Sequence, residues 1–180
     1  MSTICTVEDL DDHELIGCGF RKGGILAIGV VKADHGITDW ESASQSQDAI
    51  DAGTLKIIKG IKGIYPAASP IEGDNPRACG ADTILDGFDN TITWKDYNVG
   101  NLNDLFYAQL NRSAFTGLVI YYCQEQEIRV IEKSVTFVAL PAESPESNKE
   151  KQLYNITAKW STSVNDEFPT LYDAPAGIYE

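Results

Sequence analysis

The most regular pattern of apolar and polar positions in this chain lies between residues 117 and 160. Residues 118–123 (LVIYYC) form an unbroken apolar run after a glycine, which predicts a strand buried on both faces. Residues 128–131 resume the apolar run, and residues 134–139 alternate with a period of two, as a half-buried strand does. The polar breaks between the runs are too short for a crossover helix, so the pattern predicts an antiparallel meander.

A long charged loop and a further strand follow the meander. Residues 141–151 (PAESPESNKEK) combine proline, serine and mixed charge, and their length is near the upper end for an ordinary connection. Residues 152–162 then alternate apolar and polar side chains. We expect this strand to pair with residues 134–140 as a hairpin whose tip is the charged loop.

Two apolar segments lie nearer the start of the chain. Residues 25–31 (ILAIGVV) predict a second buried strand, in which Gly29 marks a bulge or a close backbone approach. Residues 55–64 carry lysine at every third position, but Gly60 and Gly63 are poor helix residues. These features favour a strand with one or two bulges. Its lysines either protect a solvent-exposed sheet edge against aggregation or face acidic residues of a neighbouring molecule.

The next segments predict a loop and a hairpin. Residues 65–81 are rich in proline and glycine, and a compact domain seldom carries so long a loop without using it for contact. The pattern then predicts strands at residues 82–85 and 91–97. Between them, residues 86–90 contain Asp-Gly, a strong turn signal, which predicts a hairpin connection.

Two segments have helical character. Thr38 and Glu41 match a capping box, and Gly53 stands where a helix would end, so residues between them predict a weak surface helix or an ordered loop. Residues 103–112 are the best helix candidate, with Asn101 or Asn103 as cap and an apolar face that we expect to pack on the sheet. This face consists of Leu102, Leu105, Phe106 and Leu110.

The composition is that of a globular domain with an unusual charge. The length of 180 residues predicts a single domain over residues 1–180, with an N-terminal segment at residues 1–24, and the strand patterns make that domain β-rich. Hydrophobic residues make up 43%, which is ordinary for a globular fold. The net charge of −13 argues against gripping DNA or an anionic membrane. The acidity suits a wall past which DNA slides, or else serves solubility alone.

The sequence predicts no metal, cofactor or membrane partner. The start lacks the basic region of a signal peptide, and no apolar run approaches the roughly 20 residues that span a membrane. The acidic residues at 8–14 do not have the spacing of a calcium loop. The cysteines show no CxxC spacing, and we expect them to be reduced and mostly buried. They are Cys5, Cys18, Cys79 and Cys123.

No motif in the chain carries a reaction, and we predict no catalytic residue. His35 follows Asp34, but this pair has no nucleophile beside it. Three aspartates lie close enough in the sequence to suggest the paired acids of an enzyme, although aspartate is also a routine turn residue. These are Asp86, Asp89 and Asp96.

Four segments together resemble the tail-tube-like subunits of tailed-phage virions: a helix, a meander, a charged loop and an alternating strand. They span residues 103–112, 116–140, 141–151 and 152–162, roughly the C-terminal half of the chain. In that family a β-sandwich flanked by a helix forms rings around the DNA path. The chain also resembles structural proteins of crAss-like phages of gut bacteria, including neck and tail ring proteins.

The resemblance implies a fold, partners and a location. The fold would be an antiparallel β-sandwich or barrel-like tail-tube-type domain with one packed α-helix, long loops and an extended C-terminal arm at residues 166–180. The protein would be non-enzymatic and would form a homo-oligomeric ring of six- or twelve-fold symmetry around the DNA channel. Its partners would be neighbouring ring, portal or tail proteins of the virion, after synthesis in the host cytoplasm. Loops 65–81 and 141–151 and the arm would reach adjacent subunits.

A carbohydrate- or protein-binding β-sandwich module is the alternative function. Such a module would use exposed aromatic residues as sugar platforms, and Trp94, Trp160 and Tyr121 are the candidates. Both tryptophans stand at apolar positions of alternating strands, which favours burial instead. The C-terminal arm carries aromatic side chains and two prolines, so we expect it to dock on its own sheet or on a neighbour.

Overall fold

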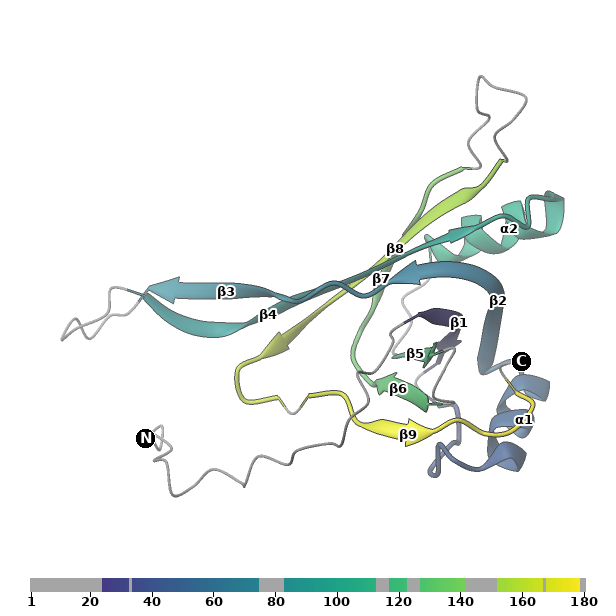
Figure 1. Ribbon diagram of the computed structural model, residues 1–180, viewed down its shortest axis with the longest axis horizontal. Helices are drawn as coiled ribbons and strands as arrows, with labels where there is room; N and C mark the ends of the chain where they lie inside the picture. Colours follow the sequence, from purple (N-terminus) through teal and green to yellow (C-terminus); the bar gives the residue numbers. More distant parts are fainter. Residues whose placement is uncertain are drawn as a thin grey trace.

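The fold is described from a computed structural model, which places residues 24–32, 34–74, 83–112, 117–122, 127–141, 152–166 and 168–178. Within these residues the chain forms nine strands and two helices (Figure 1). In chain order the elements are β1 (Ile25–Val31), α1 (Ala43–Asp51), β2 (Leu55–Ile64), β3 (Ser69–Asp74), β4 (Thr83–Asp96), α2 (Asn101–Leu110), β5 (Gly117–Tyr122), β6 (Glu127–Ile131), β7 (Thr136–Ala139), β8 (Tyr154–Ser163) and β9 (Leu171–Asp173).

The strands form one antiparallel sheet. Their order is β7-β8-β4-β2-β1-β5-β6-β9, and β3 pairs with β4 beside this path. The mainly β, antiparallel class predicted from the sequence is therefore confirmed. The ladders of the described residues do not close the sheet into a barrel.

The larger hydrophobic core lies inside the curl of this sheet. Ile120 of β5 and Ile131 of β6 belong to the same buried cluster as Phe137 of β7 and Ile156 of β8, although these strands stand toward opposite ends of the strand order. The two ends of the sheet therefore approach each other around one core without sharing a ladder. We call the gap between β6 and the β7–β8 end the open seam.

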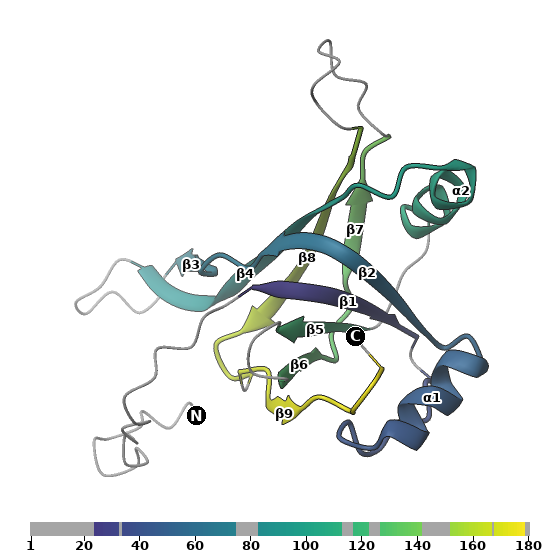
Figure 2. The same ribbon diagram turned by 45° about the vertical axis from the view of Figure 1, so that its right-hand side comes forward.

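A second cluster covers the opposite face of β1, β2 and β6. It includes Trp40 and Ala49 from the α1 region, Leu55 at the start of β2, and Ile178 from the C-terminal arm. The arm also adds β9 to the edge of β6, so its described part docks on its own sheet. Figure 2 shows α1 near the end of this arm, whereas α2 lies well apart from both.

The central strands confirm the sequence pattern in part. β5 pairs with β6, and β7 pairs with β8 as the expected hairpin. β8 alternates as predicted, with Tyr154, Ile156, Ala158 and Trp160 buried. The prediction that residues 134–139 continue the meander is wrong, because β7 pairs with β8 and not with β6. The charged loop falls almost entirely outside the described residues.

The hairpin predicted around Asp86 and Gly87 is wrong, because β4 runs straight through this dipeptide. Asp86 is the extra residue of a bulge, since Ile71 of β3 faces Gly87 and Glu72 faces Leu85. A Cβ atom at Gly87 would overlap the carbonyl oxygen of Thr162 on β8. The glycine thus permits a close approach of two strands instead of a turn.

Three further details of the sheet differ from expectation. The bulge expected at Gly29 is wrong, because Gly29 lies in an unbroken part of both its ladders and the register shift falls between Ile25 and Ala27. The segment 55–64 is a strand with a bulge at Gly60, whose φ is 70°, but it lies inside the sheet between β4 and β1 rather than at an edge. Part of the loop expected at 65–81 is strand β3, which pairs with β4.

Both helices form, but each begins at a different residue from the one predicted. α1 begins after Ser42, whose hydroxyl accepts a hydrogen bond from Gln45 N at 3.4 Å, so the capping box at Thr38 is wrong. The predicted helix end at Gly53 is confirmed by its φ of 73°. α2 begins after Gly100 without a side-chain cap.

The packed face of α2 also differs from the predicted one. Leu102 and Leu105 were expected in the core but are 84% and 57% exposed. Tyr107 and Leu110 are the buried residues of this helix. The physical reason is a polar contact made by Tyr107, which is described below.

Candidate functional site

The three aspartates singled out in the sequence do not gather into one site. Asp86 is exposed, and Asp89 accepts a hydrogen bond from the Ser161 hydroxyl at 2.7 Å. Asp96 is only 3% exposed and bonds to the hydroxyl of Tyr107. The three carboxylates therefore occupy different surroundings along one strand and do not form the paired acids of an enzyme site.

The remaining candidates from the sequence have local roles or lie outside the described residues. His35 Nδ1 accepts a hydrogen bond from Ile37 N at 3.0 Å, and its ring packs on Trp40. Trp94 and Trp160 are buried, so neither is available as a sugar platform. The side chain of Tyr121, all four cysteines and the acidic residues at 8–14 are outside the described part. Within that part, no three His, Cys, Asp or Glu side chains gather as metal ligands do.

A buried polar cluster fastens α2 to the sheet. The hydroxyl of Tyr107 donates to Asp96 Oδ2 at 2.7 Å, and the backbone and side-chain nitrogens of Asn98 donate to Asp96 Oδ1 at 2.8 and 2.7 Å. Burial, together with the hydrogen bond to Asp96, raises the pKa of Tyr107 well above its usual value. The phenol is therefore a permanent donor at neutral pH, which is what a buried carboxylate needs.

A second tyrosine completes this cluster. The hydroxyl of Tyr154 on β8 donates to Asp104 Oδ1 at 2.6 Å and accepts from Gly100 N at 3.3 Å. Burial, and then the bond to Asp104, raises the pKa of Tyr154. The rings of Tyr107 and Tyr154 lie 4.7 Å apart between centroids. These groups hold the start of α2 in place, and they point to a structural rather than a catalytic role.

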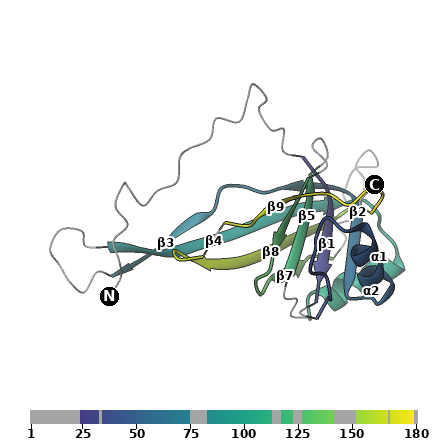
Figure 3. The same ribbon diagram turned by 90° about the horizontal axis from the view of Figure 1, so that it is seen from below.

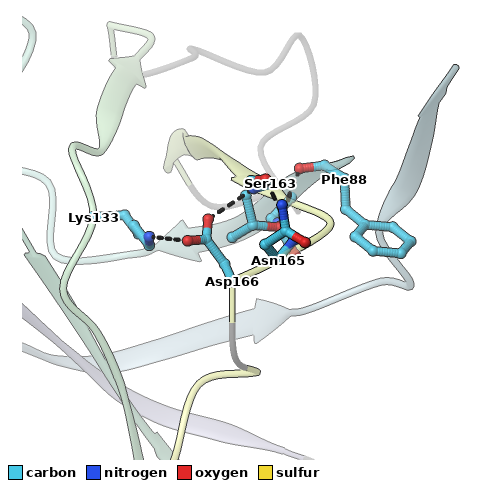
Figure 4. Close-up of polar contacts among 7 residues, drawn as sticks. Phe88, Lys133, Ser163, Asn165 and Asp166 are labelled. Carbon is cyan, nitrogen blue, oxygen red and sulfur yellow. Dashed lines mark hydrogen bonds and ion pairs between the residues drawn. The ribbon is translucent and has the colours of Figure 1, made fainter. Parts of the chain in front are cut away.

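The open seam is bridged by an ion pair near the end of β8 (Figure 4). Lys133, which follows β6, lies 2.8 Å from Asp166 Oδ1, and Asp166 Oδ2 accepts a hydrogen bond from Ser163 N at 2.7 Å. The hydrogen bonds from Lys133 and from the Ser163 backbone hold the pKa of Asp166 below its usual value. Because this contact is partly exposed, it positions the turn after β8 more than it stabilises the fold.

A cavity of about 440 Å³ lies beside this ion pair. We call it the mouth cavity. Its walls come from the segment between β2 and β3, from β4, β6 and β8, and from the start of the C-terminal arm. The lining residues used below are Tyr65, Phe88, Asn90, Arg129, Val164, Asp166 and Pro169.

Polar groups in the mouth cavity are partly paired with one another. The hydroxyl of Tyr65 donates to Asn90 Oδ1 at 3.3 Å, and Asn90 Nδ2 donates to Thr162 Oγ1 at 3.2 Å and to the carbonyl of Phe88 at 3.3 Å. Arg129 differs from these residues. Its Nε is buried and has no hydrogen-bond partner among the residues that the structure describes.

Sequence reasoning missed Arg129 as a site residue, although a signal was present. The residue interrupts the apolar run 128–131, and a charge in the middle of a buried strand is unusual without a partner. Its neighbours Ile128 and Val130 belong to the cluster under α1. Arg129 therefore projects to the other side of the sheet, into the curl.

The second candidate surface is a ribbon formed by β3 and the first part of β4. β8 pairs with β4 from Asp96 only as far as Gly87, and beyond that point β4 is paired with β3 alone. Figures 1 and 3 show this pair projecting from the body, at the opposite end of the molecule from α2. Leu85 is 41% exposed on this ribbon.

Comparisons with known proteins return nothing for this chain. No protein-family model, no curated protein and no solved structure matches it. Neither helix in the described ranges is long and apolar enough to cross a membrane. Any assignment of function therefore rests on the chain's own residues and geometry.

Proposed function

We propose that the protein is a non-enzymatic structural subunit that associates with copies of itself. The single observation that carries this proposal is the projecting ribbon of β3 and β4. Three residue pairs, from Glu72–Leu85 to Asp74–Thr83, lie beyond the last pair of β4 with β8. A two-stranded ribbon is marginally stable in water by itself, so a surface on another molecule is a natural support for it.

The edge of β3 supplies the chemistry of such a contact. β3 pairs with β4 on one side, and no ladder of the described residues covers its other side. An uncovered edge offers backbone N–H and C=O groups to a strand from another chain, and a second copy is the simplest source of that strand. If the β3 edge meets a different surface on the next copy, the contact is head-to-tail, and its repetition around an axis generates a ring when the rotation closes.

The virion assignment is the finer part of the proposal. A sheet that curls around one core, with a helix packed at its end and a projecting ribbon, is compatible with a tail-tube-type subunit of a tailed phage. The net charge of −13 suits a ring whose channel must not bind DNA phosphate. Residues 65–81, the charged loop and the C-terminal arm would then reach neighbouring ring, portal or tail proteins.

The carbohydrate-binding alternative needs exposed aromatic side chains as sugar platforms, and Trp94 and Trp160 are buried. No observation in the described residues favours it over assembly. The paired acids that an enzyme would need are likewise not brought together by β4. Assembly is therefore the function that the geometry supports best.

The experiment that tests the proposal is the mass of the purified protein over a concentration series, by light scattering and negative-stain imaging. We expect discrete multimers or rings for the wild type and a shift toward monomer for Leu85→Lys, which places a charge on the ribbon. Leu105→Lys is the matched control, since Leu105 is also an exposed leucine but lies on α2 at the other end. A monomer at every concentration, or equal assembly by Leu85→Lys, would contradict the proposal.

A further inference from the structure

The mouth cavity is lined by an arginine with one nitrogen that has no partner among the described residues. Arg129 Nε is buried without a hydrogen-bond partner, in a chain whose net charge is −13. Arginine keeps its charge at any physiological pH, and its planar group presents donors that match a carboxylate. A buried donor without an acceptor is costly, and a ligand that supplies the acceptor recovers that cost.

The carboxylate of Asp166, in the lining of the cavity, already has two partners. Asp166 shares the cavity wall with Arg129, but its Oδ1 faces Lys133 at 2.8 Å and its Oδ2 accepts from Ser163 N at 2.7 Å (Figure 4). Asn90 is likewise occupied by Tyr65, Phe88 and Thr162. The polar groups around Arg129 are therefore bonded to one another, and Arg129 Nε is left without an acceptor among the described residues.

The rest of the lining is apolar. Phe88 and the ring of Tyr65 come from one side, and Val164 and Pro169 come from the turn and arm after β8. The volume of about 440 Å³ lies in the range of sites for small molecules or single side chains.

We propose that the mouth cavity is a binding site for a carboxylate carried on an apolar or aromatic body. Arg129 holds the carboxylate, and Tyr65, Phe88 and Pro169 contact the body. The carboxylate comes either from a small organic acid or from an acidic side chain or chain end of a second copy. This site borders the base of the β3–β4 ribbon, where Phe88 pairs with Pro70, but Arg129 lies on β6, so the proposal stands whether or not the ribbon mediates assembly.

The test uses the full chain and phenylacetate as the probe, with neutral phenylacetamide as its matched control. Binding is followed by the Nε–Hε signal of Arg129 in ¹H–¹⁵N spectra and by the fluorescence of Trp160, whose ring lies 5.6 Å from that of Tyr65. We expect a saturable shift with phenylacetate and none with phenylacetamide, because the amide lacks the charge that pairs with arginine.

Two variants make the result specific. Arg129→Gln should weaken phenylacetate binding on the order of tenfold or more, and Arg112→Gln, at an exposed arginine after α2, should leave binding unchanged. If Arg129→Gln does not fold, Arg129→Lys keeps the charge and should weaken binding because it loses the planar fork. No saturable shift in the wild type, or equal binding by the Arg129 variant, would overturn the proposal.

The two sources of the carboxylate are distinguished by mass. If a second copy supplies it, phenylacetate in excess and Arg129→Gln both lower the mass in solution. If a small organic acid is the natural occupant, phenylacetate binds without changing the mass. The Leu85→Lys variant distinguishes the two proposals. If it loses assembly but still binds phenylacetate, then the binding site does not depend on contacts made by the ribbon.

Discussion

The bond between Tyr107 and Asp96 gives the sharpest test of how α2 is held. Tyr107→Phe removes a hydroxyl that donates to a buried carboxylate at 2.7 Å. Hydrogen bonds to charged groups contribute about 1.5–3 kcal/mol. Asp96 keeps the two bonds from Asn98. We therefore expect the variant to lower the free energy of unfolding by about 2 kcal/mol at neutral pH.

The pH dependence of that difference follows from the raised pKa of Tyr107. Burial, and then the bond to Asp96, raise this pKa above the usual 10.0. Above pH 10 the unfolded chain therefore loses the phenol proton while the folded chain keeps it, so stability falls as the pH rises. Tyr107→Phe has no such proton. The advantage of the wild type should be complete below about pH 9 and shrink by about 1.4 kcal/mol per pH unit above about pH 10.

Urea unfolding of both proteins at neutral pH and between about pH 9 and pH 11 measures this difference, since other groups titrate alike in the two chains. By about pH 11 the initial 2 kcal/mol should have fallen to about 0.6 kcal/mol. Tyr97→Phe, at a more exposed tyrosine, is the control for loss of a hydroxyl and should change stability little. A difference that stays constant above pH 10, or a variant as stable as the wild type, would refute the reasoning.

Two substitutions test how the strands of the sheet are held together, each by urea unfolding. Gly87→Ala should lower stability by about 1–3 kcal/mol, because its Cβ overlaps a backbone carbonyl, whereas Gly24→Ala meets open space and should be nearly neutral. Asn111→Ala removes two bonds to Ala139, at 2.6 and 2.8 Å, that fasten the edge strand β7 to the end of α2. It should cost about 2 kcal/mol and speed hydrogen exchange at the Ala139 amide. Wild-type stability in either Gly87→Ala or Asn111→Ala would contradict the corresponding contact.

The parts of the fold that the sequence predicts well are those decided within one strand. The alternation from Tyr154 to Trp160 needs no knowledge of the partner, because one face of the strand meets the core and the other meets solvent. The run 25–31 is equally clear, since it is apolar on both faces. The β7–β8 hairpin is predictable because its two strands adjoin in sequence.

The failures have a common physical cause, which is contact between distant segments. Asp-Gly at 86–87 is a turn signal by itself, and only the presence of β3 on one side and β8 on the other makes it a bulge. The side chains of Leu102 and Leu105 are more apolar than that of Tyr107, so the sequence pattern favours burial of the two leucines. Tyr107 nevertheless faces inward, because its hydroxyl donates a hydrogen bond to Asp96 on β4.

The mouth cavity could not be predicted from the sequence for the same reason. Arg129 is conspicuous within its strand, but an arginine there is also compatible with a solvent-exposed face. The position becomes a site residue only because β6 lies near the end of the strand order and its inner face turns toward β4 and β8. Pairing between strands far apart in sequence decides that arrangement, and a local pattern carries no information about it.

A break in the pairing along β4 relates the two proposals to each other. β2 and β3 both pair with the same side of β4, and Pro66, which lacks an N–H to donate, lies between them. The break at this point lets Tyr65 line the mouth cavity and lets β3 continue along β4 beyond the body. A closed barrel would pair the ends of the sheet with each other and would leave Arg129 facing a sealed core. The break between β2 and β3 therefore contributes both to the mouth cavity, through Tyr65, and to the projecting edge of β3.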